Sequence, residues 1–118
     1  MKLITTEQHT QLLANGWLAR LAGRAGSDFD PQPVVKLFTP GACSRWLLTE
    51  IDPIDNDRAY GLCDAGDGRP ELSYVSLREL EDLRGIRRDP VVRDLRFVAD
   101  KPLSAYAEVA YTRGLIIT

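Results

Sequence analysis

Four short segments with strand character follow one another without a helical segment between them, and this order restricts the fold more than any other feature. They are rich in branched and aromatic residues and cover residues 33–39, 45–52, 58–63 and 71–75, and each of the first three ends at turn-forming Pro, Gly or Asp. Parallel neighbours would need crossover connections of about a dozen residues or more, which these turns do not supply. The pattern therefore predicts an antiparallel meander.

A helical pattern precedes these segments. Thr5 and Gln8 have the spacing of a capping box, and apolar residues then recur at helical intervals. Gly16 either ends this helix or is tolerated inside a longer one. We predict a helix over residues 6–22 and, because Gly, Asp, Pro and Ser dominate the next stretch, a loop over residues 23–33.

Further elements are predicted after the fourth strand. Ser76 and Glu79 repeat the capping-box spacing at the start of a second helix, which Gly85 is expected to end. Residues 94–98 have strand character, and Pro102 opens a last helix.

These elements predict one α+β domain. The fold expected over residues 1–118 is an antiparallel sheet of about five strands with two to three helices packed on one face, the sheet and its helices lying in 34–112. A chain with 44% apolar and 27% charged residues has the composition of a domain with a core rather than of a disordered segment.

The composition also excludes several classes of function. One histidine and two cysteines are too few for a zinc cluster with four such ligands or for a disulfide framework. Neither a membrane-spanning apolar stretch nor a signal peptide is recognisable, so we expect a cytoplasmic protein without a membrane partner. In that compartment Cys43 and Cys63 are expected to be free thiols.

Several runs of sequence, taken in their order and spacing, resemble a known family. They are Pro33–Pro40, Trp46–Glu50, Tyr60–Asp64, Pro70–Leu80, Arg93–Asp94 and Lys101–Ala107. The chain resembles the domain of unknown function 2958 family, uncharacterised bacterial proteins that are often encoded on plasmids and other mobile elements. The resemblance implies a small bacterial domain but no reaction. Ser73 stands where the family usually has Gly, and Val92 stands where it usually has an acidic residue.

The segment from Glu50 to Glu71 is rich in carboxylates. Side chains alternate along a strand, so Glu50 and Asp52 are expected to share a face with Trp46. Together with Asp64 they are candidates for a Mg²⁺ or Ca²⁺ site or an acid/base pair, as in a small metal-dependent hydrolase or nuclease. The alternative is that these carboxylates cap turns, where Asp is favoured.

Glu50 differs from the other carboxylates because it lies between apolar residues. An unpaired carboxylate there would be costly, so we expect an arginine partner, with Arg93 or Arg45 as candidates.

A second charged stretch is basic. Its arginines are Arg84, Arg87, Arg88, Arg93 and Arg96. Guanidinium groups suit phosphate or carboxylate recognition, so this stretch is a candidate for binding nucleic acid or an acidic protein. The alternative is a network of ion pairs with the acidic segment.

Without a cofactor motif or a convincing catalytic constellation, the sequence favours a non-enzymatic protein-binding domain. The candidate interaction residues are Arg84, Arg87, Arg88, Arg93, Glu50, Asp52, Asp64 and Trp46. The resemblance suggests a host or defence protein as the partner, which would make the chain an accessory or anti-defence factor. An exposed edge strand would also allow a homodimer.

Overall fold

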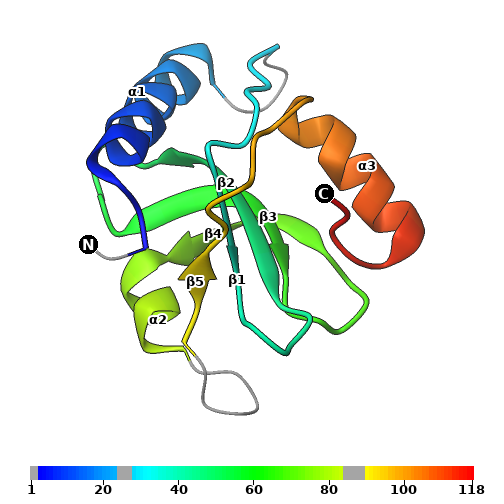
Figure 1. The fold of residues 1–118 in the computed structure, drawn as a ribbon. Coiled ribbons are helices and arrows are strands. Elements are labelled where there is room, and N and C mark those ends of the chain that lie inside the picture. Colours follow the sequence, from blue (N-terminus) through cyan, green and yellow to red (C-terminus); the bar gives the residue numbers. More distant parts are fainter. Residues whose placement is uncertain (1–2, 24–27, 84–89) are drawn as a thin grey trace.

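Five antiparallel strands form one open sheet in the order β4-β3-β2-β1-β5 (Figure 1). The computed structural model of the chain describes residues 3–23, 28–83 and 90–118. The strands are β1 Val35–Phe38, β2 Arg45–Ile51, β3 Arg58–Asp64, β4 Glu71–Ser76 and β5 Val92–Arg93, and the helices are α1 Thr6–Ala22, α2 Leu77–Asp82 and α3 Leu103–Arg113. The predicted antiparallel α+β architecture is confirmed.

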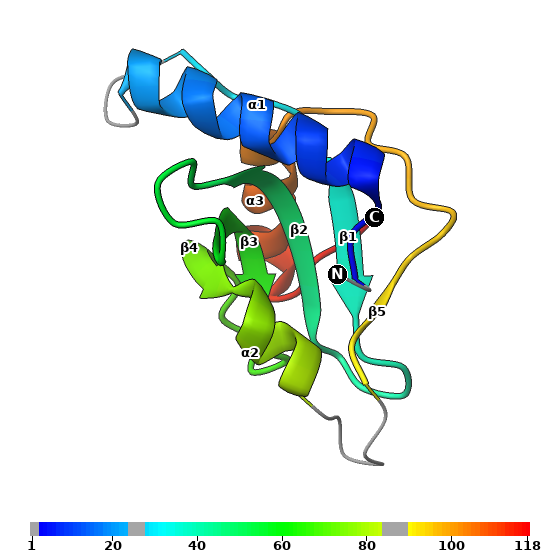
Figure 2. The same ribbon diagram turned by 90° about the vertical axis from the view of Figure 1, so that its left-hand side faces the viewer.

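The helices lie on both faces of the sheet, so the expectation that they all pack on one face is wrong. One buried cluster joins Leu12 of α1 and Leu80 of α2 to Trp46 of β2. A second cluster joins Tyr106 of α3 to Leu47, the next residue of β2. Adjacent side chains of a strand point to opposite faces, so α3 covers the face opposite to α1 and α2 (Figure 2).

A β-bulge in β2 changes which side chains share a face. The register with β3 shifts between Leu48 and Glu50, which leaves Thr49 without an opposite residue. As a result Ile51, and not Glu50, lies in the buried cluster with Leu48. The expectation that Glu50 and Asp52 share a face with Trp46 is therefore wrong, because the extra residue reverses the alternation.

Helix α1 packs on this bulge. The Asn15 side chain donates its amide hydrogen to the Thr49 carbonyl over 2.9 Å and accepts one from Gln11 over 3.0 Å. Gly16 lies inside the helix, and a Cβ there would be 1.8 Å from the Ile51 carbonyl oxygen. Glycine is therefore required for close approach, and it does not end the helix.

The ends of the other helices are set by local capping. The Ser76 hydroxyl caps α2, which ends at Asp82, before Gly85; Gly85 lies outside the described residues. Helix α3 ends at Gly114, whose φ of +76° is in the left-handed region.

The fifth strand is shorter than expected and lies earlier in the chain. Val92 and Arg93 pair with β1, and the Asp94 amide still donates to the Lys36 carbonyl. The Asp94 carboxylate then accepts the Arg96 amide over 2.9 Å, which turns the chain away from the sheet. The strand predicted at residues 94–98 is therefore wrong.

The contact at Gly16 predicts an unusual response to alanine. In an exposed helix Gly→Ala stabilises by about 1 kcal/mol. Here the added methyl group meets backbone, so Gly16→Ala should lower the free energy of unfolding by about 1–3 kcal/mol in urea denaturation. Ala14→Ser, at an exposed position of the same helix, should change it by less than about 0.5 kcal/mol. A Gly16→Ala protein as stable as wild type would contradict the packing of α1 on β2.

Candidate functional site

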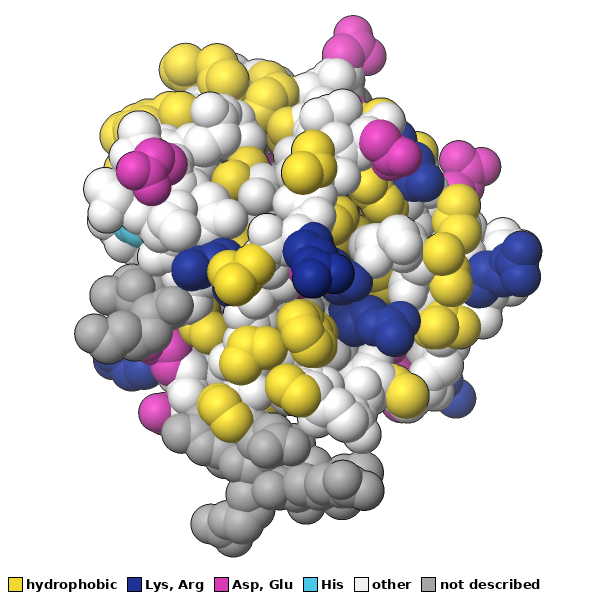
Figure 3. Space-filling model, in the orientation of Figure 1, with side chains coloured by type: hydrophobic (Ala, Val, Ile, Leu, Met, Phe, Trp, Pro, Cys, Tyr) yellow, Lys and Arg dark blue, Asp and Glu magenta, His cyan; other side chains and the backbone are white. Residues whose placement is uncertain are grey.

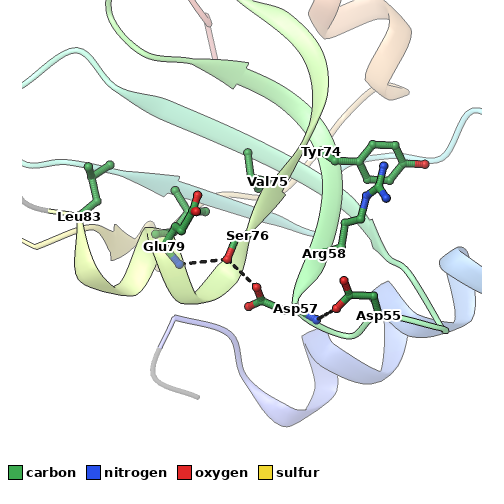
Figure 4. A pocket seen from close by; sticks show the side chains of 9 residues that line it. Asp55, Asp57, Arg58, Tyr74, Val75, Ser76, Glu79 and Leu83 are labelled. Atoms are coloured by element: carbon green, nitrogen blue, oxygen red, sulfur yellow. Dashed lines mark hydrogen bonds between the residues drawn. The ribbon is translucent and has the colours of Figure 1, made fainter.

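Asp57 organises the junction between β3, β4 and α2. Its backbone carbonyl accepts the Leu77 amide over 2.8 Å, and its Oδ1 accepts the Arg78 amide over 2.8 Å. Its Oδ2 accepts the Ser76 hydroxyl over 2.5 Å, while the Ser76 oxygen accepts the Glu79 amide over 3.2 Å (Figure 4). The first three amides of α2 are thus all bonded, and the helix start is held against the start of β3.

These bonds favour the ionised form of Asp57. The Ser76 hydroxyl and then the Arg78 amide hold the pKa of the Asp57 carboxyl below its ordinary value of 3.8. The sequence predicted a capping box at Ser76 and Glu79, and the serine half of it is confirmed. The second cap comes from Asp57, a residue far away in the sequence.

An aromatic pair lies beside this junction. The rings of Tyr60 on β3 and Tyr74 on β4 are 5.0 Å apart and meet edge to face. The Arg58 guanidinium lies against the Tyr74 ring (Figure 4). Its distance from the ring centre is 3.9 Å. The Tyr74 side chain nevertheless remains 41% exposed, so part of it is available for contact.

A cavity of about 510 Å³ opens between these elements. Its lining residues come from the start of β3, the end of β4 and α2: Asp55, Asp57, Arg58, Tyr74, Val75, Ser76, Glu79, Leu80 and Leu83. Leu83 at the end of α2 is 41% exposed. The cavity therefore combines carboxylates with partly exposed apolar surface, a combination that suits an amphipathic side chain.

The cavity adjoins the free edge of the sheet, since β4 is the terminal strand of the sheet order. Leu77 lies opposite Asp57 in the continued β3–β4 register and donates its amide to the Asp57 carbonyl. Hydrogen-bonding direction alternates along an antiparallel strand, so Ser73 and Val75 bond to β3. It follows that the backbone amides and carbonyls of Leu72 and Tyr74 point away from the sheet.

Most acidic residues of the predicted metal site serve local turns. Asp52 Oδ1 accepts the Ile54 amide over 2.8 Å. Asp64 is fully buried, and its two oxygens accept the Gly66 amide over 2.8 Å and the Ile116 amide over 3.0 Å. Asp64 pairs with Arg45, at the end of β2 remote from Glu50. The set of Glu50, Asp52 and Asp64 is therefore not brought together.

Glu50 is only 4% exposed and lies opposite Tyr60 in the sheet. It lines a smaller cavity of about 220 Å³, whose lining also includes Arg20 of α1. Arg45 is at the other end of β2 and donates to the Ile116 carbonyl over 2.8 Å. Arg93 pairs with Leu37, which lies opposite Trp46 and not Glu50. Arg45 is thus placed away from Glu50, whereas the pairing of Glu50 with Arg93 stays a prediction.

The other predicted interaction residues do not form a single surface in the described part of the chain. Arg84, Arg87 and Arg88 lie outside the described residues. Trp46 is only 6% exposed and belongs to the core. Figure 3 shows basic side chains in the middle of one face and hydrophobic ones gathered over α1.

Residues 3–23, 28–83 and 90–118 contain no group of three or more His, Cys, Asp or Glu side chains that could hold a metal ion. Nor does a helix in these ranges have the length and apolarity to cross a membrane. Cys43 and Cys63 are both free. Burial, and then the nearby charge of Glu71, raise the pKa of the Cys63 thiol to about 12, so this thiol is a poor nucleophile.

Sequence reasoning missed the residues that form the larger cavity. Tyr74, Asp57, Arg58, Glu79 and Leu83 were not among the expected interaction residues. A signal was present in the spacing of the β3–β4 hairpin, because Tyr60 and Tyr74 are equally far from the middle of the intervening turn.

Comparisons with known proteins identify a family but no activity. The profile of a family described as "Protein of unknown function (DUF2958)" matches residues 3–117, nearly the whole chain. No curated protein and no solved structure matches the chain.

The capping role of Asp57 predicts how stability depends on pH. A carboxyl group whose pKa is lower in the folded than in the unfolded state stabilises the fold at pH values above its ordinary pKa of 3.8. This stabilisation is lost as the pH falls through the pKa of the folded state. Asp57→Asn should therefore lower the melting temperature at pH 7, and the difference from wild type should shrink as the pH falls well below 3.8.

Asp28→Asn, the same charge change at an exposed position outside α2, serves as the control. A difference between wild type and Asp57→Asn that is equally large at neutral and strongly acidic pH would contradict the role of the ionised carboxylate.

Proposed function

The chain belongs to the DUF2958 family of proteins of unknown function, and we propose that it is a non-enzymatic domain that binds another protein along the free edge of β4. The observation that carries this proposal is the outward direction of the Leu72 and Tyr74 backbone groups on a terminal strand. Such an edge can accept an extended segment of a partner as an additional strand.

The side chains of β4 support the same use. Leu72 is 38% exposed and Tyr74 is 41% exposed, so two apolar side chains on the same face of the strand lie beside the outward-facing backbone groups. Of these groups, the Tyr74 carbonyl accepts the hydroxyl of the neighbouring Ser73 over 3.3 Å. Proteins usually protect a free edge with lysine, proline or a bulge, because it otherwise pairs with other chains. Within β4 itself, Glu71 at the first position is the only charged residue, which leaves the rest of the edge unprotected.

The proposal also covers where the protein acts and on which kind of partner. The resemblance to bacterial proteins encoded on mobile elements favours a bacterial, cytoplasmic protein that acts on a host or defence protein as an accessory or anti-defence factor. A photo-crosslinking amino acid at position 72, introduced in the native host, should give a defined adduct with one such protein. Adducts only with abundant bystander proteins would count against this setting.

A proline at position 72 tests the proposed function. It removes an amide that points outward, so the bonds between β3 and β4 are kept, as is usual for proline on an edge strand. Wild type should select peptides from a displayed library of random 12-residue sequences, and Leu72→Pro should lose this selection. Leu72→Ala, which keeps the amide, should still select peptides.

Circular dichroism and the melting temperature establish that both variants are folded. A folded Leu72→Pro protein that selects the same peptides as wild type would show that binding does not use the β4 edge.

A further inference from the structure

The cavity of about 510 Å³ and the β4 edge form one continuous surface. Tyr74 has an outward-facing backbone and also lines the cavity, together with Val75 and Ser76 of the same strand. A segment that pairs with Tyr74 would therefore run past the opening of the cavity. Alternate side chains of that segment, about 7 Å apart, would point to the same side, and one of them would reach the cavity.

The charge of the cavity is one-sided. Asp55, Asp57 and Glu79 contribute carboxylates to its lining, whereas Arg58 contributes the only guanidinium or ammonium group among the lining residues that the structure describes. That guanidinium is already placed over the Tyr74 ring, at 3.9 Å from its centre. Asp57 is used in capping α2, whereas the side chains of Asp55 and Glu79 are exposed. One oxygen of Asp55, Oδ1, accepts the Asp57 amide over 3.1 Å.

On the basis of the proposed function, we propose that the partner segment is an extended peptide that places a lysine or arginine side chain in this cavity. The charged end would lie between Asp55 and Glu79, where a charge-assisted hydrogen bond is available. The aliphatic part would pack on Val75 and the half-exposed Leu83. The backbone of β4 then provides general affinity, and the cavity provides selectivity for a basic residue.

A second copy of this chain fits the edge less well. In a symmetric antiparallel pair with Leu72 opposite Tyr74 of the copy, Pro70 would lie opposite Ser76. Proline has no amide hydrogen to donate, so the paired segment would be short at both ends. A foreign basic peptide has no such restriction.

The test begins with the same displayed library of random 12-residue peptides. The inference predicts that peptides selected by wild type share a Lys or Arg at one fixed position among alternating apolar residues. A synthetic peptide of the selected sequence is then compared, by isothermal titration calorimetry, with one in which Gln replaces that basic residue. Glu79→Gln should weaken binding of the basic peptide about fivefold and leave binding of the Gln peptide unchanged.

Glu108→Gln, which removes an exposed carboxylate on α3, is the matched control and should change neither affinity. Two results would overturn this inference and leave the edge-binding function standing. In the first, Leu72→Pro abolishes selection, but the selected peptides share no basic residue at a fixed position. In the second, Glu79→Gln lowers the affinity for both peptides equally. A library from which nothing is selected, or a wild-type protein that sediments as a dimer with a blocked edge, would overturn both.

Discussion

Asp57 holds the start of β3, the end of β4 and the beginning of α2 at one point, and the candidate site depends on this junction. Its carbonyl and carboxylate satisfy two amides of α2, while the Ser76 hydroxyl bonded to it satisfies a third. A helix as short as α2, Leu77–Asp82, has little stability of its own. Its position beside β4, which makes one wall of the larger cavity, is therefore set by these caps and by the burial of Leu77 and Leu80.

The order of the first four strands could be predicted from the sequence because it depends on local signals. Turn residues separate these strands, and the short connections permit only antiparallel neighbours. The bulge at Thr49 could not be predicted in this way. It depends on α1, whose Asn15 bonds the Thr49 carbonyl from 34 residues away and whose Gly16 lies against Ile51. Because the bulge reverses the alternation, every inference about the face of Glu50 failed with it.

The candidate site was less accessible to sequence reasoning than the fold. Asp52, Asp64 and Asp57 look alike in sequence, yet one caps a turn, one bonds the C-terminal segment and one caps a helix. Tyr74 is exposed because β4 is the terminal strand of the sheet. The sequence pattern alone does not predict which strand is terminal, so this exposure could not be predicted. The turn-capping alternative was therefore closer to what the structure shows than the metal-site hypothesis.

Amide hydrogen exchange, followed residue by residue by NMR, tests the availability of the β4 edge most directly. If the backbone of β4 is oriented as the register with β3 requires, the amides of Leu72 and Tyr74 exchange rapidly while those of Ser73 and Val75 are protected. Binding of a selected peptide should then protect Leu72 and Tyr74. Slow exchange of these two amides in the unbound monomer would contradict the account, because the edge would already be occupied.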